Sequence, residues 1–174
     1  MKFNSYKPFY AQNHAPALDE IGIRPLACTG VLRCADGLVF ARRSDSVMLN
    51  QNTWELAPSG IFDEFAVNPD GTLSTQTTFT NEMAEELGIL EKTPQIQEVL
   101  VALEDLQQNS IDLTVPAKVQ FSAKEIHSHF RSRQTKEYSK VAVVRENDVC
   151  DFVTMYSPDI VPISLEILDI LNLT

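Results

Sequence analysis

The stretch TNEMAEELGI, residues 80–89, carries three glutamates at the spacing of one helix face. Glu82, Glu85 and Glu86 stand at i, i+3 and i+4, so an α-helix advancing about 100° per residue places them together. An adjoining apolar stripe is formed by Phe79, Met83 and Leu87. Three carboxylates held this close repel one another unless a cation or a shared proton intervenes. The pattern therefore predicts a helix that needs a counter-charge.

The neighbouring sequence does not supply that charge. From Ser44 through Glu91 there is no Lys or Arg, while nine residues are acidic: Asp45, Glu55, Asp63, Glu64, Asp70, Glu82, Glu85, Glu86 and Glu91. A hard divalent ion that takes oxygen ligands is the simplest answer, with Mg²⁺ first and Mn²⁺ as the alternative. A lysine from elsewhere or a solvated acidic helix face are the competing interpretations.

The same residues resemble the box of the Nudix hydrolase family. That box runs Gly, five residues, Glu, seven residues, then Arg-Glu-apolar-x-Glu-Glu-x-Gly-apolar, and residues 82–89 match its second half position for position. The first half is looser: Gly60 is interpreted as the box glycine and Glu64 as the stand-in for its first glutamate, followed by an inserted loop over residues 65–76. Asn81 occupies the position of the family's arginine, which normally pairs with box carboxylates.

The resemblance spans residues 22–174 and implies an α/β fold, an α/β/α sandwich with a mixed β-sheet. It also implies divalent-metal-dependent hydrolysis of a diphosphate linkage in a nucleoside diphosphate derivative such as a nucleotide sugar. Such a reaction needs an activated water and neutralised phosphate charge, which divalent ions provide. The implied metal ligands are Glu82, Glu85, Glu86 and the backbone carbonyl of Gly60, and Glu85 and Glu86 are also the implied catalytic residues.

Residues outside the helix are expected to complete the site. Glu137, on a polar loop before a strand, is the chosen candidate for a catalytic base, with Glu104 and Glu125 as rivals. Arg42 and Arg43 end a predicted strand, where they could hold phosphate through charge-assisted hydrogen bonds. Their competing role is to form salt bridges with the acidic half of the chain.

Two other functions stay open. A nucleotide-binding or regulatory module would result if Asn81 and the inserted loop had weakened catalysis while leaving the ligand cleft. An isomerase of the isopentenyl diphosphate type would need a cysteine near the strand that ends at Ser59. Because no cysteine lies between Cys34 and Cys150, the isomerase is the least favoured function.

Composition sets the remaining expectations. With 174 residues and 44% apolar residues, the chain is expected to form one domain over residues 23–174, preceded by an N-terminal arm over residues 1–22. The net charge of −10 argues against nonspecific binding to nucleic acid or to an anionic membrane. The expected partner is therefore a small molecule, and the aromatic arm offers a surface for a homodimer.

The three cysteines, at positions 28, 34 and 150, lack metal-ligand spacing and are expected to be reduced and mostly buried. Together with the lack of a signal-like or membrane-spanning apolar stretch, they predict a cytoplasmic protein. His14, His127 and His129 do not form a metal motif, and Trp54 is expected in the core.

Periodicity and turn residues predict strands mixed with three helices. Strands are expected over residues 25–32, 38–43, 54–58, 96–103, 111–121 and 139–145, and helices over residues 77–87, 122–130 and 164–171. Asp36-Gly37 is expected to turn between the first two strands, and Gly88 to end the acidic helix. Pro116 predicts an irregular or edge-like strand, and Ser122 with Glu125 predicts a capping box.

Overall fold

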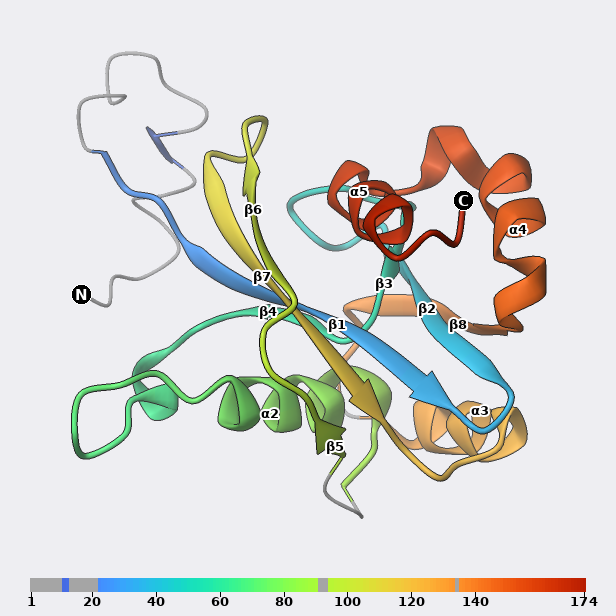
Figure 1. The fold of residues 1–174 in the computed structure, drawn as a ribbon, viewed down its shortest axis with the longest axis horizontal. Coiled ribbons are helices and arrows are strands. Elements are labelled where there is room, and N and C mark those ends of the chain that lie inside the picture. The colour runs from blue at the N-terminus through green and yellow to red at the C-terminus, as the bar shows by residue number, and fades with distance from the viewer. Residues whose placement is uncertain (1–10, 13–21, 91–93, 134) are drawn as a thin grey trace.

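A computed structural model describes residues 11–12, 22–90, 94–133 and 135–174 (Figure 1). The predicted N-terminal arm, with His14, therefore lies almost entirely outside the described residues. The strands are β1 (Leu26–Cys34), β2 (Gly37–Arg43), β3 (Trp54–Leu56), β4 (Ser59–Ile61), β5 (Gln95–Ile96), β6 (Val101–Asp105), β7 (Ser110–Lys118) and β8 (Tyr138–Val144). The helices are α2 (Thr75–Leu87), α3 (Ala123–Ser132), α4 (Val149–Tyr156) and α5 (Pro162–Ile170), with short 3₁₀ turns at Glu64–Ala66, Glu146–Asp148 and Ser157–Asp159.

The strands form one mixed sheet around β1. β1 pairs in parallel with β7, while β2 and β4 pair antiparallel with different parts of its other edge. β2 joins at Arg33 and Cys34, whereas β4 joins at residues 27–29, so the two strands diverge along β1. This divergence leaves room beside the first half of β1, where the cavity described below lies.

Helices cover the two faces of the sheet, with α2 and α3 on one face and α4 and α5 on the other (Figure 1). Alternate residues of β2 explain the two cores, because successive side chains of a strand point to opposite faces. Val39 and Ala41 belong to the core under α2 and α3, whereas Leu38 and Phe40 belong to the core under α4 and α5. The predicted α/β sandwich with a mixed sheet is confirmed.

The acidic helix α2 is capped at its start by a side chain and at its end by a backbone amide. The Ser74 hydroxyl accepts a hydrogen bond from the Thr77 amide at 3.1 Å, so the helix begins at Thr75, two residues before the predicted start. At its other end Gly88 adopts a φ of 71°, and its amide donates to the Ala84 carbonyl at 3.1 Å. The predicted glycine cap is confirmed.

The predicted inserted loop before α2 is folded against itself. Asp63 caps the 3₁₀ turn at Glu64–Ala66, accepting from the Phe65 and Ala66 amides. A tight turn then places the Gly71 amide 2.9 Å from the Asn68 carbonyl. These local bonds bring the chain back to the start of the helix.

The interrupted pairing at Pro116 agrees with the irregular strand that the sequence predicts, whereas the edge-like alternative is wrong. β7 is not an edge strand, because it lies between β1 on one side and β5 and β6 on the other. Pro116 is accommodated because it falls between the residues paired with β6, which end at Thr114, and those paired with β5, which begin at Ala117. Helix α4 was not predicted; it packs Phe152 and Tyr156 against Trp54, which is buried as expected.

The strand predicted over residues 54–58 is β3, which ends at Leu56; the cis Ala57–Pro58 peptide follows, and then β4. The capping box of Ser122 and Glu125 is present at the start of α3. The cysteines are free, but only Cys28 is buried and Cys150 is exposed, so the prediction of mostly buried thiols is wrong.

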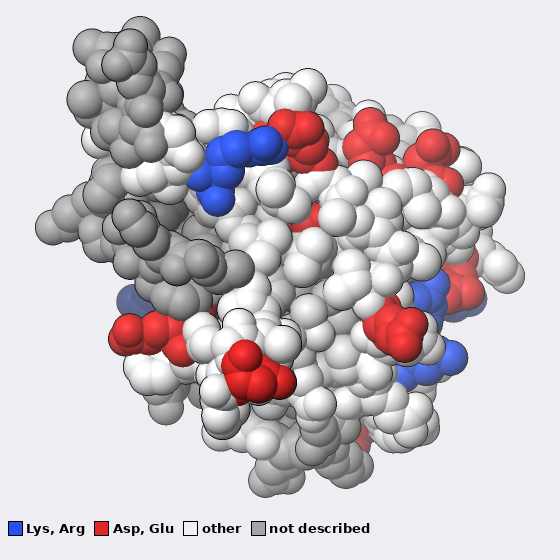
Figure 2. Space-filling view, turned by 60° about the vertical axis from the view of Figure 1, so that its left-hand side comes forward, with Lys and Arg blue, Asp and Glu red and all other residues white. Residues whose placement is uncertain are grey.

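The described surface reflects the acidic composition. On the face in Figure 2, Asp and Glu side chains outnumber Lys and Arg and are spread over the surface. Among the described helices, none is both long and apolar enough to cross a membrane.

Candidate functional site

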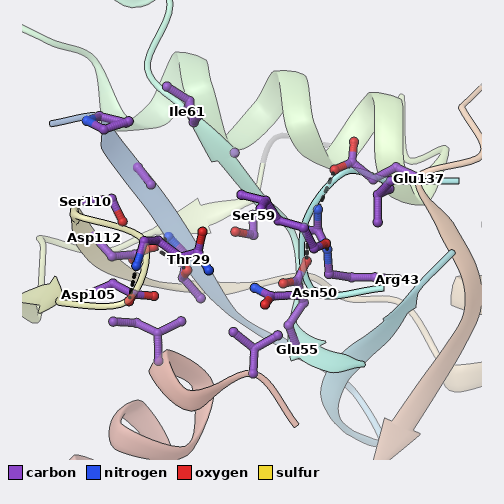
Figure 3. Close-up of a pocket in the computed structure, with 18 of the residues that line it drawn as sticks. Thr29, Arg43, Asn50, Glu55, Ser59, Ile61, Asp105, Ser110, Asp112 and Glu137 are labelled. Atoms are coloured by element: carbon purple, nitrogen blue, oxygen red, sulfur yellow. Dashed lines mark hydrogen bonds and ion pairs between the residues drawn. The ribbon is translucent and has the colours of Figure 1, made fainter. Parts of the chain in front are cut away.

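A cavity of about 520 Å³ lies where β4 diverges from β2 along β1. Figure 3 shows Asp105, Ser110, Asp112 and Thr29 at one end of this cavity and Arg43 and Glu137 at the other, with Ser59 between them. Its charged lining residues are Arg43, Glu55, Glu82, Asp105, Asp112 and Glu137. The cavity is therefore lined by five carboxylates and a single cationic side chain among the described residues.

Glu82 of α2 lies directly against Gly60 of β4. A Cβ atom on Gly60 would stand 1.9 Å from Glu82 Oε1, so any larger residue at position 60 would displace the carboxylate. Burial, followed by the charges of Glu85 and Glu137, raises the pKa of Glu82 to about 8. The side chain thus carries a weakly held proton near neutral pH and would ionise readily beside a cation.

Glu86 is the most deeply buried carboxylate of the helix, at 1% exposure. Its Oε2 accepts a hydrogen bond from the Ser59 amide at 3.0 Å, while its Oε1 is buried with no hydrogen-bond partner. Burial, and then the charges of Glu82, Glu137 and Glu55, raise its pKa well above the ordinary value. A buried acceptor without a partner is costly, so Oε1 is suited to a ligand.

The residues at the other polar positions of the predicted Nudix box are exposed to solvent. Glu85 is exposed on α2, and Asn81 is exposed one turn before it. Glu64 is exposed in the 3₁₀ turn, whereas its neighbour Asp63 acts on the pKa of Glu82. Of the two acidic residues after β4, Asp63 is therefore the one whose charge affects Glu82. The spacing of the family's box does not predict that Asp63 lies close to Glu82.

A second set of charges comes from the opposite side of the cavity. Glu55 of β3 is 5% exposed and accepts at Oε1 from Arg43 Nη1 at 2.8 Å and from the Tyr138 hydroxyl at 2.6 Å. Arg43 Nη2 also contacts Glu137 Oε1 at 3.4 Å. Burial raises the pKa of Glu137 and the charge of Arg43 opposes that shift. We call Glu82, Glu85 and Glu86 the helix side, and Arg43, Glu55 and Glu137 the arginine side.

The remaining sequence candidates lie outside this cluster. Arg42 is not among the cavity-lining residues and donates from Nε to the Asn52 carbonyl at 2.9 Å. Glu104 forms an ion pair with Arg24, and Glu125 belongs to the capping box of α3. Of the three candidate bases, only Glu137 lines the cavity.

The far end of the cavity holds a residue that sequence reasoning missed. Asp112 of β7 is 6% exposed and accepts from the Thr29 amide at 3.1 Å and the Thr29 hydroxyl at 2.9 Å. Burial raises its pKa to about 6, against the lowering effect of the Thr29 bonds. Its partner lies across the parallel β1–β7 pairing, which links segments 83 residues apart and has no local sequence signal.

A cysteine also lies closer to the site than its position in the sequence suggests. Cys28 of β1 pairs with Gly60 across the sheet. It is 2% exposed, and burial together with the charges of Asp112 and Glu82 raises the pKa of its thiol to about 12. The thiol is therefore protonated at neutral pH and poorly suited to act as a nucleophile.

Whether a metal ion fits this site depends on the carboxylate oxygens of the helix side. Within the described ranges, no group of three or more His, Cys, Asp or Glu side chains is arranged so that it could hold a metal ion. The pair Glu82 and Glu86 nevertheless offers what a hard cation requires: carboxylate oxygens, one of them buried without a partner, and no ion pair to Lys or Arg among the described residues. The donor set fits Mg²⁺ or Mn²⁺.

Comparisons with solved structures identify the architecture. The NUDIX domain of Shewanella oneidensis NrtR, in complex with ADP ribose, superposes with a TM-score of 0.59 at 17% identity over 84% of this chain and 85% of that one. A NUDIX hydrolase from Nitrosomonas europaea gives 0.55 at 10% identity over 84% and 87%. The protein has the Nudix fold. No family model and no curated protein matches the sequence.

A third structure with this fold contains a metal. The bifunctional NMN adenylyltransferase/ADP ribose pyrophosphatase from Francisella tularensis, complexed with AMP and a Mn ion, gives a TM-score of 0.58 at 12% identity. The match covers 95% of this chain but 46% of that one. The resemblance to Nudix hydrolases predicted from residues 82–89 is thus confirmed at the level of the fold.

Proposed function

We propose that this protein is a divalent-metal-dependent hydrolase that cleaves the diphosphate linkage of a nucleoside diphosphate derivative. The observation that carries the proposal is the pair of carboxylates on α2. Glu86 has a buried oxygen without a hydrogen-bond partner. Glu82 lies against Gly60, which has no side chain, and the pKa of Glu82 is raised to about 8. Both features are costly in the protein alone and become favourable beside a cation.

The residues divide into proposed roles. Glu82, Glu85, Glu86 and the Gly60 carbonyl are the proposed ligands of Mg²⁺ or Mn²⁺, and Glu85 and Glu86 are also proposed to be catalytic. A bound divalent ion would neutralise phosphate charge and make water a better nucleophile at neutral pH. Of the two arginines predicted as phosphate contacts, Arg43 lines the cavity and Arg42 does not.

Glu137 is proposed to accept the proton of the attacking water. Its side chain is 39% exposed at the cavity, so water reaches it, and burial raises its pKa, which makes it a stronger base. The charge of Arg43 opposes part of that shift.

The proposed substrate class comes from the cavity and the comparisons. A volume of about 520 Å³ is in the usual range for a small-molecule ligand. The structures with bound nucleotide compounds hold ADP ribose in one case and AMP in the other. ADP-ribose and nucleotide sugars are therefore the first compounds to test.

The test is product release from a panel of ADP-ribose, nucleotide sugars, dinucleoside polyphosphates and nucleoside triphosphates, with Mg²⁺ or Mn²⁺ and with a chelator. The proposal expects metal-dependent cleavage of one class, lost in Glu86→Gln. Glu146→Gln is the matched control, because Glu146 pairs with Arg33 outside the cavity. Cleavage that persists with chelator would contradict the proposed metal dependence.

The second candidate is a nucleotide-binding module without turnover. Asn81 favours it, because an exposed amide on α2 replaces the arginine that pairs with box carboxylates in the family. Binding of ADP-ribose by the folded protein, with no cleavage of any compound in the panel, would select this function.

A further inference from the structure

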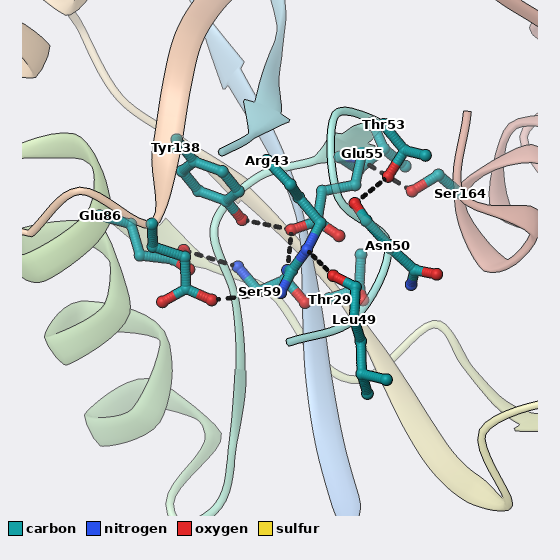
Figure 4. A network of polar contacts seen from close by, with 12 residues as sticks. Thr29, Arg43, Leu49, Asn50, Thr53, Glu55, Ser59, Glu86, Tyr138 and Ser164 are labelled. Carbon is teal, nitrogen blue, oxygen red and sulfur yellow. Dashed lines mark hydrogen bonds and ion pairs between the residues drawn. The ribbon is translucent and has the colours of Figure 1, made fainter. Parts of the chain in front are cut away.

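Arg43 is a cation whose guanidinium bonds three separate parts of the site. Its side chain is 15% exposed. Nε donates to the Leu49 carbonyl at 3.1 Å and Nη1 to Glu55 at 2.8 Å (Figure 4). Nη2 contacts Glu137 at 3.4 Å (Figure 3). One side chain thereby joins the β2–β3 connection, strand β3 and the segment before β8.

The partners of Arg43 explain why this cation is fixed in place. Glu55 is buried, and a buried carboxylate needs hydrogen-bond donors to offset the loss of water. It receives one from Arg43 and another from the hydroxyl of Tyr138, which is itself fully buried. Burial opposes the charge of Arg43, but its carboxylate neighbours outweigh burial and raise its pKa.

The backbone around Arg43 reinforces these contacts. The Arg43 amide donates to the Thr53 carbonyl at 2.8 Å, and the next amide, of Ser44, donates to the Glu137 carbonyl at 2.7 Å. The β2–β3 connection also lines the cavity with Val47, Met48, Leu49 and Asn50. The end of β2 therefore contacts both the β2–β3 connection, which lines the cavity, and Glu137, the proposed base.

We propose that Arg43 is a positioning residue rather than a phosphate contact. It holds the Glu137 carboxylate at the cavity and fixes the β2–β3 connection, which carries Leu49. Arg43 of β2 thus supplies an orienting cation, whereas the neutral Asn81 of α2 does not. A phosphate contact would have to share this guanidinium with two carboxylates and a carbonyl that already accept from it. The catalytic consequence rests on the proposed hydrolase function, whereas the positioning of the two segments does not.

The first test needs no activity. Hydrogen exchange followed by mass spectrometry is measured on the wild type, Arg43→Met and Arg43→Lys, on peptides covering residues 44–53 and 135–138. We expect exchange in both peptides to accelerate about tenfold or more in Arg43→Met, because both segments lose a shared partner. Arg33→Met is the matched control: Arg33 pairs with Glu146 at 2.8 Å outside the cavity, and its loss should leave both peptides unchanged.

Exchange within twofold of the wild type in both peptides would overturn the proposal. If Arg43→Met does not fold, Arg43→Lys decides, because lysine keeps the charge but cannot reach three acceptors from a planar fork. Faster exchange in both peptides of a folded Arg43→Lys variant supports the proposal, and unchanged exchange contradicts it.

The second test separates positioning from substrate binding. With ADP-ribose and Mg²⁺, Arg43→Lys should lower kcat by about tenfold or more and leave KM within about twofold, because a misplaced base affects the chemical step. A tenfold rise in KM with unchanged kcat would instead make Arg43 a phosphate contact and overturn the proposal. If the wild type cleaves nothing in the panel, the hydrolase proposal fails while the exchange measurement still decides whether Arg43 positions both segments.

Discussion

The two sides of the site are both acidic, but they neutralise their charge differently. On the arginine side, Glu55 and Glu137 share Arg43, and Glu55 also receives the Tyr138 hydroxyl. On the helix side, Glu82 and Glu86 have no Lys or Arg ion pair among the described residues, and burial raises the pKa of both. On the arginine side, the charge of Arg43 partly neutralises the two carboxylates. On the helix side, only protons or an added cation can neutralise the carboxylates.

We interpret this difference as one between carboxylates neutralised by the protein itself and carboxylates left for a ligand. A buried ion pair with satisfied hydrogen bonds orders the elements around it. A buried carboxylate oxygen without a partner contributes no such order and lowers stability unless something binds. We therefore place the proposed metal on the helix side, and the variants that test this comparison are changes on or against α2.

The largest effect is expected from removing charge on the helix side. Glu86→Gln and Glu85→Gln should each lower kcat by about a thousandfold or more, because the amide keeps the side-chain volume but loses a negative charge that a metal requires. Steady-state kinetics with Mg²⁺, alongside circular dichroism to confirm folding, measure this. Unchanged rates in both variants would contradict the proposed site.

Adding one carbon to Gly60 should have the next largest effect. In Gly60→Ala the new Cβ meets Glu82 Oε1, so we expect a loss of about a hundredfold in kcat/KM and a destabilisation of about 1 to 3 kcal/mol. Gly71→Ala is the matched control, since a Cβ there meets nothing within 4 Å although its φ of 84° is unfavourable for alanine. Gly71→Ala should lose about 1 kcal/mol of stability and no activity; equal activity losses in both variants would contradict the role of Gly60.

Stability of the metal-free protein should fall as the pH rises from about 4.5 to about 8. The folded state holds the Glu82 proton up to pH 8, while the unfolded chain releases it near 4.5, so ionisation disfavours the folded state. Glu86 acts in the same direction. We expect a decrease on the order of 2 kcal/mol from Glu82, less than the full pKa shift would give because Glu82 is partly exposed.

Urea unfolding at several pH values, with and without Mn²⁺, measures this dependence. Glu82→Gln should flatten the decrease, and Mn²⁺ should oppose it by favouring the ionised carboxylates. A metal-free protein whose stability rises over this pH range would contradict the assignment of uncompensated charge to the helix side.

The smallest effect is expected when a cation is restored to the helix side. Asn81→Arg places a guanidinium one turn from Glu85 on the exposed face of α2, so activity should be maintained or raised by up to about threefold, with stability changed by less than about 0.5 kcal/mol. Kinetics and urea unfolding check both values. A folded Asn81→Arg variant with a large loss of rate would show that the carboxylates are arranged differently from those of the family.

Local sequence signals predicted much of the fold. The spacing of Glu82, Glu85 and Glu86 gave the helix, Gly88 gave its end, and the Ser122–Glu125 box gave the start of α3, because each depends on residues within one or two turns. The β1–β2 hairpin followed from Asp36-Gly37 for the same reason.

Long-range placement could not be predicted in this way. The spacing of the glutamates places all three on one helix face, but it does not reveal that Glu86 is buried while Glu85 is exposed, because that depends on the contact of α2 with β4. Glu55 and Asp112 each have a partner 83 residues away, and Arg43 contacts Glu137, 94 residues away, so these contacts have no local signal. The central position of Pro116 likewise depends on two separate strands sharing one edge of β7.

The central claim, that the helix side is a cation site, is tested most directly by isothermal titration of Mn²⁺ into the metal-free wild type, the Glu82→Gln/Glu86→Gln double variant and the Glu146→Gln control. We predict that the wild type and the control bind Mn²⁺ with the same affinity and that the double variant loses binding by a hundredfold or more, because two carboxylate ligands are removed. Equal Mn²⁺ affinity in all three proteins would contradict the claim.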